Sequence, residues 1–191
     1  MIIGITGGTG CGKTTLLQAI AQKGGMILDC DEIYHQLLAT DPALLAQIEN
    51  RFPGVSDDSG LNRKKLGQLV FGDPQGLLDL NAITHNAVKA EVLRRLASNP
   101  TLAAIDAIGL FESGLDQLCQ VTVAVTAPRE DRICRLMNRD GISREYAESR
   151  INAQHTEDWF RERCDHVLHN DGTLDAFTGK CIAFLQQIGI M

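Results

Sequence analysis

The chain has 191 residues, of which 44% are hydrophobic, enough to bury one substantial core with at most one small inserted subdomain. Its formal net charge of -6 provides no broad basic surface, which argues against a protein that holds nucleic acid by its phosphates. Because no stretch approaches the roughly twenty apolar residues that span a bilayer, and the chain enters an apolar strand instead of a charged leader, we expect a cytoplasmic location.

Short apolar runs alternate with segments of helical spacing along the chain. They predict strands over 1–6, 26–29, 102–106, 121–125 and 166–169, and helices over 15–21, 33–38, 42–48, 63–71, 73–97, 129–138, 143–153, 156–163 and 174–188. Five such strands separated by helices indicate an α/β fold, with a parallel sheet covered by helices on both faces.

The span from 33 to 97 shows no strand pattern, and 52–60 within it is turn-rich. A helical block of this length is too long for one ordinary crossover, so we interpret it as an inserted lobe that holds a substrate. The expected organisation is a single domain with a core at about 1–32, 98–134 and 164–191, a helical lobe at about 33–97 and a lid at about 135–163.

The segment from Gly7 to Thr14 spells G-x-x-x-x-G-K-[ST] between a predicted strand and a predicted helix. Its glycines let successive N–H groups turn toward an anion, and the helix adds its positive dipole end. The motif predicts that a nucleotide's phosphates are bound by Gly8, Thr9, Gly10, Cys11, Gly12, Lys13, Thr14 and Thr15. Lys13 would reach the β- and γ-phosphates, and Thr14 would place its hydroxyl on Mg²⁺. The alternative is a glycine-rich turn that only joins strand to helix.

Acidic residues follow two of the strands, where a ligand crevice is expected. Asp29 and Asp31 alternate at the end of the second strand, where one of them could accept a proton from an acceptor hydroxyl. Alternatively, Asp31 could cap the next helix, with Asp31 and Glu32 interacting with the helix dipole. Asp106 ends the third strand and could hold Mg²⁺ through water, or it could be a turn residue.

Arginines are concentrated on two successive predicted helices that flank Asp140-Gly141. Guanidinium groups suit phosphate oxygens and would serve a lid over a nucleotide. We expect most of them to be solvated or paired with neighbouring acids, and select Arg135, Arg139 and Arg150 as functional. Gly141 would be a lid hinge or simply a helix C-cap.

The cysteines and histidines do not suggest a metal centre. Six cysteines contain no C-x-x-C pair, which suits free thiols in a reducing compartment. His166 and His169 would point to opposite faces of a strand, so we reject a zinc site there. Cys11 is interpreted as a small residue in the loop, with a redox-sensitive thiol as the alternative.

Together these motifs resemble the dephospho-coenzyme A kinase family nearly end to end. The resemblance rests on Gly4 to Thr14, Leu28-Asp29-Cys30-Asp31, Ile83-Thr84-His85, Asp106 with Leu110-Phe111-Glu112, Arg139 to Ser143, Arg150-Ile151 with Gln154, and Cys164 to Asn170. The chain departs from the family pattern at Asn86, where proline is usual, and at Ile108-Gly109, which replace a central Pro-Leu.

The resemblance implies a three-layer P-loop kinase fold with a five-stranded parallel sheet, a helical substrate-binding insertion and an arginine-rich helical lid. It implies ATP- and Mg²⁺-dependent phosphorylation of the ribose 3′-hydroxyl of dephospho-coenzyme A, the final step of coenzyme A synthesis. The implied roles are catalysis by Asp31, Lys13 and Arg139, further ATP contacts from Arg135 and Asn170, acceptor binding by Asp31, His85, Glu112 and Arg150, and metal binding by Thr14 and Asp106. The expected partners are these small molecules alone, with no nucleic acid or membrane, in a monomer or weak homo-oligomer.

Other functions remain open from the sequence. Another small-molecule kinase, such as a nucleoside monophosphate kinase, would share the loop, the fold and the lid. A GTP-dependent switch would account for the D-x-x-G match at 106–109, but guanine recognition needs an N-K-x-D step and the chain has no Asn-Lys pair. The departures at Asn86 and Ile108 also permit an inactive homologue that binds nucleotide without transferring phosphate.

Overall fold

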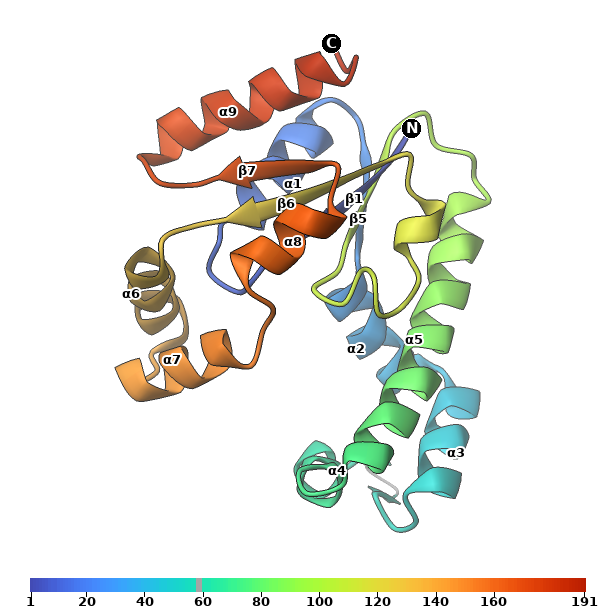
Figure 1. Ribbon diagram of the computed structural model, residues 1–191. Coiled ribbons are helices and arrows are strands. Elements are labelled where there is room, and N and C mark those ends of the chain that lie inside the picture. The colour runs from blue at the N-terminus through green and yellow to red at the C-terminus, as the bar shows by residue number, and fades with distance from the viewer. Residues whose placement is uncertain (58–59) are drawn as a thin grey trace. The chain divides into compact units, whose positions relative to one another are not determined.

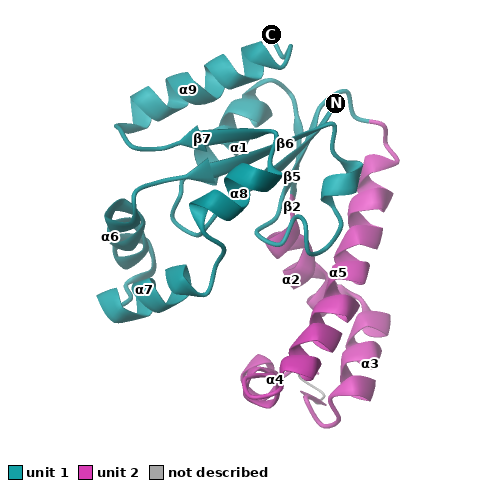
Figure 2. Cartoon of the chain, in the orientation of Figure 1, with its two compact units in different colours: residues 1–28, 100–191 teal, residues 29–99 magenta. Residues whose placement is uncertain are grey.

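The computed structural model describes residues 1–57 and 60–191, and divides the chain into two compact units (Figure 2). Unit 1 comprises residues 1–28 and 100–191, and unit 2 comprises residues 29–99. The turn-rich span predicted at 52–60 includes residues 58 and 59, which lie outside the described residues.

Unit 1 is built on a five-stranded sheet in the order β2-β5-β1-β6-β7 (Figure 1). The strands are β1 (Ile2–Thr6), β2 (Met26–Asp29), β5 (Ala103–Asp106), β6 (Val121–Thr126) and β7 (His166–His169). β1 pairs in parallel with β5 and β6, and β6 pairs in parallel with β7. Buried apolar residues fill β1, β5 and β6, as expected for a parallel sheet covered on both faces. The predicted fold class is confirmed.

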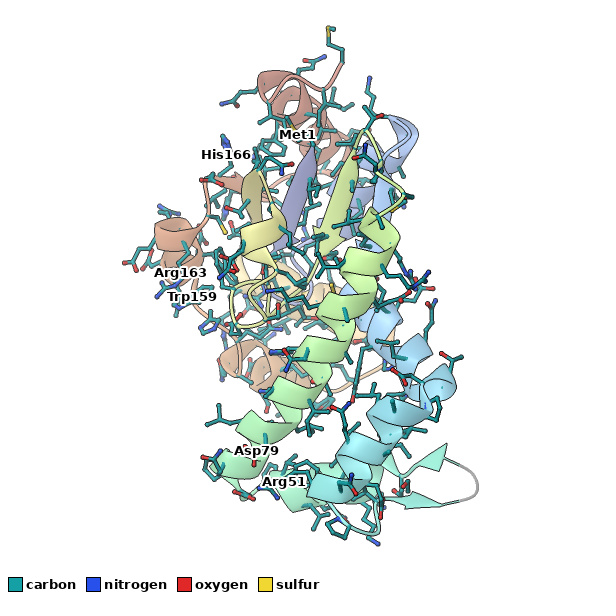
Figure 3. The ribbon with its side chains drawn as sticks, turned by 90° about the vertical axis from the view of Figure 1, so that its right-hand side faces the viewer. Met1, Arg51, Asp79, Trp159, Arg163 and His166 are labelled. Atoms are coloured by element: carbon teal, nitrogen blue, oxygen red, sulfur yellow. The ribbon has the colours of Figure 1, made fainter. Side chains whose placement is uncertain are left out.

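Helices cover both faces of this sheet (Figures 1 and 3). Those that contact its strands are α1 (Lys13–Gln22), the short 3-10 helix η1 (Asp116–Leu118), α8 (Glu157–Arg163) and α9 (Leu174–Gln187), while α6 (Arg129–Asp140) and α7 (Arg144–Asn152) pack mainly against each other. α1 and α9 pack together over Ile3, Ile5 and Val123. On the other face of β1, a Cβ at Gly4 would lie 2.8 Å from Cys119 Sγ, so only glycine lets the segment around η1 approach this strand.

The helix pair α6 and α7 has a small core of its own, made of Ile133, Leu136, Ala147 and Ile151. Gly141 separates the two helices with a left-handed φ of 65°, and its N–H donates to the carbonyl of Met137. Gly141 is therefore a helix C-cap, which was one of the two predicted roles.

Unit 2 is mainly helical, with α2 (Cys30–Thr40), α3 (Pro42–Arg51), α4 (Arg63–Val70) and α5 (Pro74–Leu96). Its core is formed by Leu38, Leu44, Ile48, Phe52, Val55 and Leu66. The ion pair between Arg51 of α3 and Asp79 of α5, at 2.6 Å, joins two of these helices (Figure 3). The expectation that this span lacks strands is wrong, because β3 (Ser56–Asp57) and β4 (Gly60–Leu61) form an antiparallel pair. Strands of two residues are too short to show alternation in the sequence.

None of the helices within the described residues combines the length and hydrophobicity needed to cross a membrane.

Candidate active site

The loop between β1 and α1 is wound by glycines in a conformation that other residues rarely adopt. φ is +127° at Gly7, +77° at Gly10 and +98° at Gly12. A Cβ at Gly7 would lie only 2.1 Å from the carbonyl oxygen of Val125 in β6. These positions require glycine for both conformation and space.

Two arginines of α6 bind the carbonyl groups of this loop. Arg132 donates from Nε to the oxygen of Thr9 at 3.0 Å, and Arg135 donates from Nη1 to the oxygen of Gly10 at 3.1 Å. They lie three positions apart and therefore share one face of the helix. The predicted functional role of Arg135 stays a proposal, and its observed contact is to the loop itself.

A third support comes from Asn170, which follows β7 and is buried. Its Nδ2 donates to the carbonyl of Cys11 at 2.9 Å, and its backbone N–H donates to Thr126 at 2.8 Å. A Cβ on Gly12 would come within 2.4 Å of the same Nδ2 atom. Asn170 therefore packs directly against the loop, a contact that the predicted ATP-binding role did not specify.

The carbonyls of Thr9, Gly10 and Cys11 are thus bound by side chains from later in the chain, whereas several N–H groups of the loop are not. In the hydrogen-bond network of residues 1–57 and 60–191, the N–H groups of Gly10, Gly12, Lys13 and Thr14 have no backbone or side-chain acceptor. They lie at the N-terminus of α1, where the helix dipole also favours negative charge. The arrangement can bind an anion such as a phosphate chain.

Lys13 and Asp106 lie beside this loop. Lys13 Nζ donates to the carbonyl of Gly7 at 3.2 Å and lies 3.9 Å from Asp106 Oδ1, with side chains only 15% and 14% exposed. Thr14, the second residue of α1, is exposed. The Thr14 hydroxyl and Asp106 carboxylate are hard oxygen donors of the kind that Mg²⁺ takes.

The acids at the end of β2 have separate roles. Asp29 is the N-cap of α2, and its Oδ1 accepts from the N–H groups of Asp31 at 2.9 Å and Glu32 at 3.0 Å. The expectation that Asp31 caps this helix is wrong, because Asp29 occupies the cap, but Asp31 and Glu32 do lie in the first turn, where the helix dipole favours negative charge. The Asp31 carboxylate is left in the exposed first turn.

Two of the three arginines selected from sequence bind one carboxylate. Arg139 Nε lies 2.6 Å from Asp140, and Arg150 Nη1 lies 2.7 Å from the same side chain. Hydrogen bonds from Arg139 and then Arg150 lower the pKa of Asp140 to about 2. Arg144 likewise pairs with Glu130 at 2.7 Å, in line with the expectation that many arginines here are paired.

The acceptor-site candidates are divided between the units: Asp31 and His85 belong to unit 2, while Glu112 and Arg150 belong to unit 1. His85 is half-buried in α5. Glu112 Oε1 lies 2.5 Å from His155 Nε2, and the His155 ring stacks on Trp159 at 3.7 Å. Arg163 covers the same indole at 4.3 Å (Figure 3).

Cys11 is 2% exposed, and burial raises the pKa of its thiol despite the nearby positive charges of Arg132 and Lys13. A raised pKa lowers the fraction of reactive thiolate, which favours the small-residue interpretation of Cys11. His169 Nδ1 lies 2.8 Å from Thr126 Oγ1, and the His166 ring packs against Phe184.

The sequence interpretation missed Arg132 and Gln154 as residues that contact the loop. Gln154 lies between α7 and α8, and its Oε1 accepts from the N–H of Thr9 at 2.9 Å. The spacing of Arg132 to Arg135 could have pointed to a shared face. Gln154 follows Arg150-Ile151 in one of the family motifs, but no local pattern indicated its contact.

Comparisons with known proteins agree with this geometry. The dephospho-CoA kinase family model matches residues 1–176. A dephospho-CoA kinase of Latilactobacillus sakei is 36% identical over 191 residues, covering 97% of this chain and 95% of the relative. The structure of TT1252 from Thermus thermophilus is 32% identical, with a TM-score of 0.83 over 98% of this chain and 97% of its own. A dephospho-CoA kinase from Campylobacter jejuni is 23% identical, with a TM-score of 0.68 over 98% of this chain and 96% of its own, and supports the fold alone.

Proposed function

The chain belongs to the dephospho-CoA kinase family, and from this premise we propose that it transfers the γ-phosphoryl group of ATP to the ribose 3′-hydroxyl of dephospho-CoA. The family consists of ATP-dependent phosphotransferases that phosphorylate dephospho-CoA in coenzyme A biosynthesis. The finer proposal concerns the hydroxyl that is phosphorylated, the metal ion and the residues that act.

The glycine loop is the observation that carries the proposal. The carbonyls of Thr9, Gly10 and Cys11 are bound by Arg132, Arg135 and Asn170, so the protein's own side chains hold the loop in shape without a nucleotide. Phosphoryl transfer depends on positioning and charge neutralisation more than on covalent chemistry. A loop organised in advance supplies the positioning without a cost at the moment of reaction.

Lys13 would bind the β- and γ-phosphate oxygens, since its ammonium group lies beside the loop. Thr14 and Asp106 would hold Mg²⁺, which neutralises phosphate charge when bound. Among the described residues no group of three His, Cys, Asp or Glu side chains could hold a metal ion. The pair Thr14 and Asp106 still fits Mg²⁺, because this ion commonly takes only one or two protein oxygens and completes its coordination with phosphates and water.

The acceptor would be bound by Asp31, His85, Glu112 and Arg150, with Asp31 accepting the proton of the attacking hydroxyl. Support for Asp31 comes from the Asp29 cap, which leaves the Asp31 carboxylate exposed. Arg139 would stabilise the transferring group, and Arg135 and Asn170 would contribute to ATP binding. For this role Arg139 and Arg150 must exchange Asp140 for phosphate oxygens.

A kinase with another small acceptor is the second candidate, because the loop and the arginine helices would serve it equally. The cytoplasmic location and the monomeric or weakly associated state stay predictions from the sequence.

The test is a coupled assay with ATP or GTP as donor and dephospho-CoA, AMP, CMP or shikimate as acceptor. We expect turnover with ATP and dephospho-CoA, with the new phosphate placed on the 3′-oxygen by phosphorus–proton correlation NMR. Lys13→Ala should lower kcat at least about a hundredfold. Lys23→Ala, at the exposed end of α1, is the matched control and should leave kcat unchanged. Preferential use of another acceptor, or phosphate on another oxygen, contradicts the proposal.

A further inference from the structure

The peptide groups on both sides of Thr9 are held by one closed ring of hydrogen bonds. The N–H of Thr9 donates to Gln154 Oε1 at 2.9 Å, and its carbonyl accepts from Arg132 Nε at 3.0 Å. Arg132 Nη2 completes the ring by donating to the same Gln154 oxygen at 2.9 Å. Thr9 is only 8% exposed, so water has little access to replace these bonds.

The ring also accounts for the glycine at position 8. A Cβ there would lie 2.2 Å from Arg132 Nη2 and 2.9 Å from Gln154 Oε1. Gly8 is not among the residues with a left-handed φ, so conformation alone does not require glycine. The space that a side chain would occupy is taken by the Arg132–Gln154 hydrogen bond.

We propose that Gln154 is a positioning residue of the kinase, which fixes the phosphate loop by holding Thr9 together with Arg132. This inference rests on the proposed function only in assigning the loop to ATP. Arg132 lies near the start of the α6–α7 pair, and Gln154 lies two residues after its end, where its own N–H donates to the carbonyl of Ile151. The arginine-bearing helices are thus attached to the loop at both ends, and their position and the loop's shape are coupled.

The proposal predicts a selective defect. Without the Gln154 oxygen, the N–H of Thr9 and one Arg132 nitrogen lose their acceptor, and the loop must be ordered by ATP itself. ATP should therefore bind more weakly, whereas dephospho-CoA binding at saturating ATP should be unchanged. A purely structural role would instead lower thermal stability and affect both substrates alike.

The test is Gln154→Met, which keeps the length of the side chain and removes the acceptor. We expect the Kd of MgATP, measured by calorimetry without acceptor, to rise about tenfold, as for loss of a hydrogen bond to a charged group. The KM for dephospho-CoA should change less than about twofold, and Tm should shift little. Gln187→Met makes the same change at an exposed position of α9 and should alter none of these values.

Arg132→Met provides the second arm. If the two side chains act through one ring, Gln154→Met should weaken MgATP binding less than about threefold in the Arg132→Met background. An equal effect in both backgrounds, or an unchanged Kd in Gln154→Met, overturns the proposal. Because ATP binding is measured without acceptor, the result stands even if wild-type enzyme does not phosphorylate dephospho-CoA, which would contradict the proposed function alone.

Discussion

Asn170 donates a hydrogen bond to the carbonyl oxygen of Cys11 across 2.9 Å, although the two residues are 159 positions apart in the chain. The same side-chain nitrogen lies too close to Gly12 to leave room for a Cβ on that residue. Gly12 and Asn170 are therefore in close contact, and a substitution at either residue should displace the other.

Gly12→Ala tests this fit. The added methyl would approach Asn170 Nδ2 to 2.4 Å, at a backbone φ of +98° that disfavours any side chain. We expect MgATP binding to be lost in calorimetry. Combining Gly12→Ala with Asn170→Ala should restore binding only in part, because the second change removes the contact but not the backbone strain.

Gly179→Ala is the control for Gly12→Ala. Gly179 lies inside α9, and a Cβ at this position would meet nothing within 4 Å. Alanine there should raise the free energy of unfolding by about 0.5–1 kcal/mol with ATP affinity unchanged. Normal ATP affinity in Gly12→Ala would contradict the fit between Gly12 and Asn170.

Asp31→Asn separates catalysis from helix capping. The substitution leaves the Asp29 cap in place, so Tm should be unchanged while kcat falls by about two to four orders of magnitude. Glu32→Gln alters the neighbouring exposed acid of the same turn and should keep near-normal turnover. Asp29→Ala should instead lower the free energy of unfolding by about 0.5–2 kcal/mol through loss of the cap. Near-normal turnover of Asp31→Asn would remove it from the mechanism.

Asp165 gives a pH-dependent contribution to stability. Its Oδ2 accepts from the backbone N–H of Thr122 and from the Thr122 hydroxyl, each at 2.8 Å, and these bonds lower its pKa, the backbone bond having the larger effect. A lowered pKa stabilises the fold above the unfolded-state value of about 3.9, and the contribution is lost as pH falls through the folded-state pKa.

Asp165→Asn should therefore lower the free energy of unfolding at pH 7 by about 0.5–1 kcal/mol, a modest figure because Asp165 is exposed and solvent screens its charge. Urea unfolding should be measured from pH 7 down to pH 3. The difference in the free energy of unfolding between Asp165→Asn and wild type should shrink below about pH 4. A difference that stays constant with pH would mean that Asp165 does not act through its charge.

Much of the core was predictable because its signals are local. The strand pattern of β1, the spacing of α1 and the glycine motif between them lie within twenty-two residues. The cap at Asp41 before Pro42 is equally local, and the structure has its side chain accepting from Ala43 and Leu44.

The contacts behind the loop were not predictable in the same way. Gln154 and Arg132 reach Thr9 across 145 and 123 positions, and nothing in their neighbourhood indicates that partner. For this reason Arg132 was not among the arginines selected as functional. The sequence of a helix rich in charged residues does not show which of its arginines contacts backbone carbonyls elsewhere in the fold. The helix cap after β2 was also placed wrongly, at Asp31 and not at Asp29, because either acid suits an N-cap and the sequence does not mark the exact end of the strand.

The residues that bind the phosphate loop, Arg132, Arg135 and Asn170, are synthesised more than a hundred positions after it. The loop therefore cannot reach its final structure until late in synthesis on the ribosome. β1 has no neighbour in the sheet until residues 103–106 are made, while residues 29–99 form a continuous unit that can fold earlier. At about 5–20 residues per second, Asn170 follows Gly12 by on the order of ten seconds or more. We therefore expect a nascent chain halted before Asn170 not to bind ATP, so that nucleotide binding arises only after the residue that follows β7 has been synthesised.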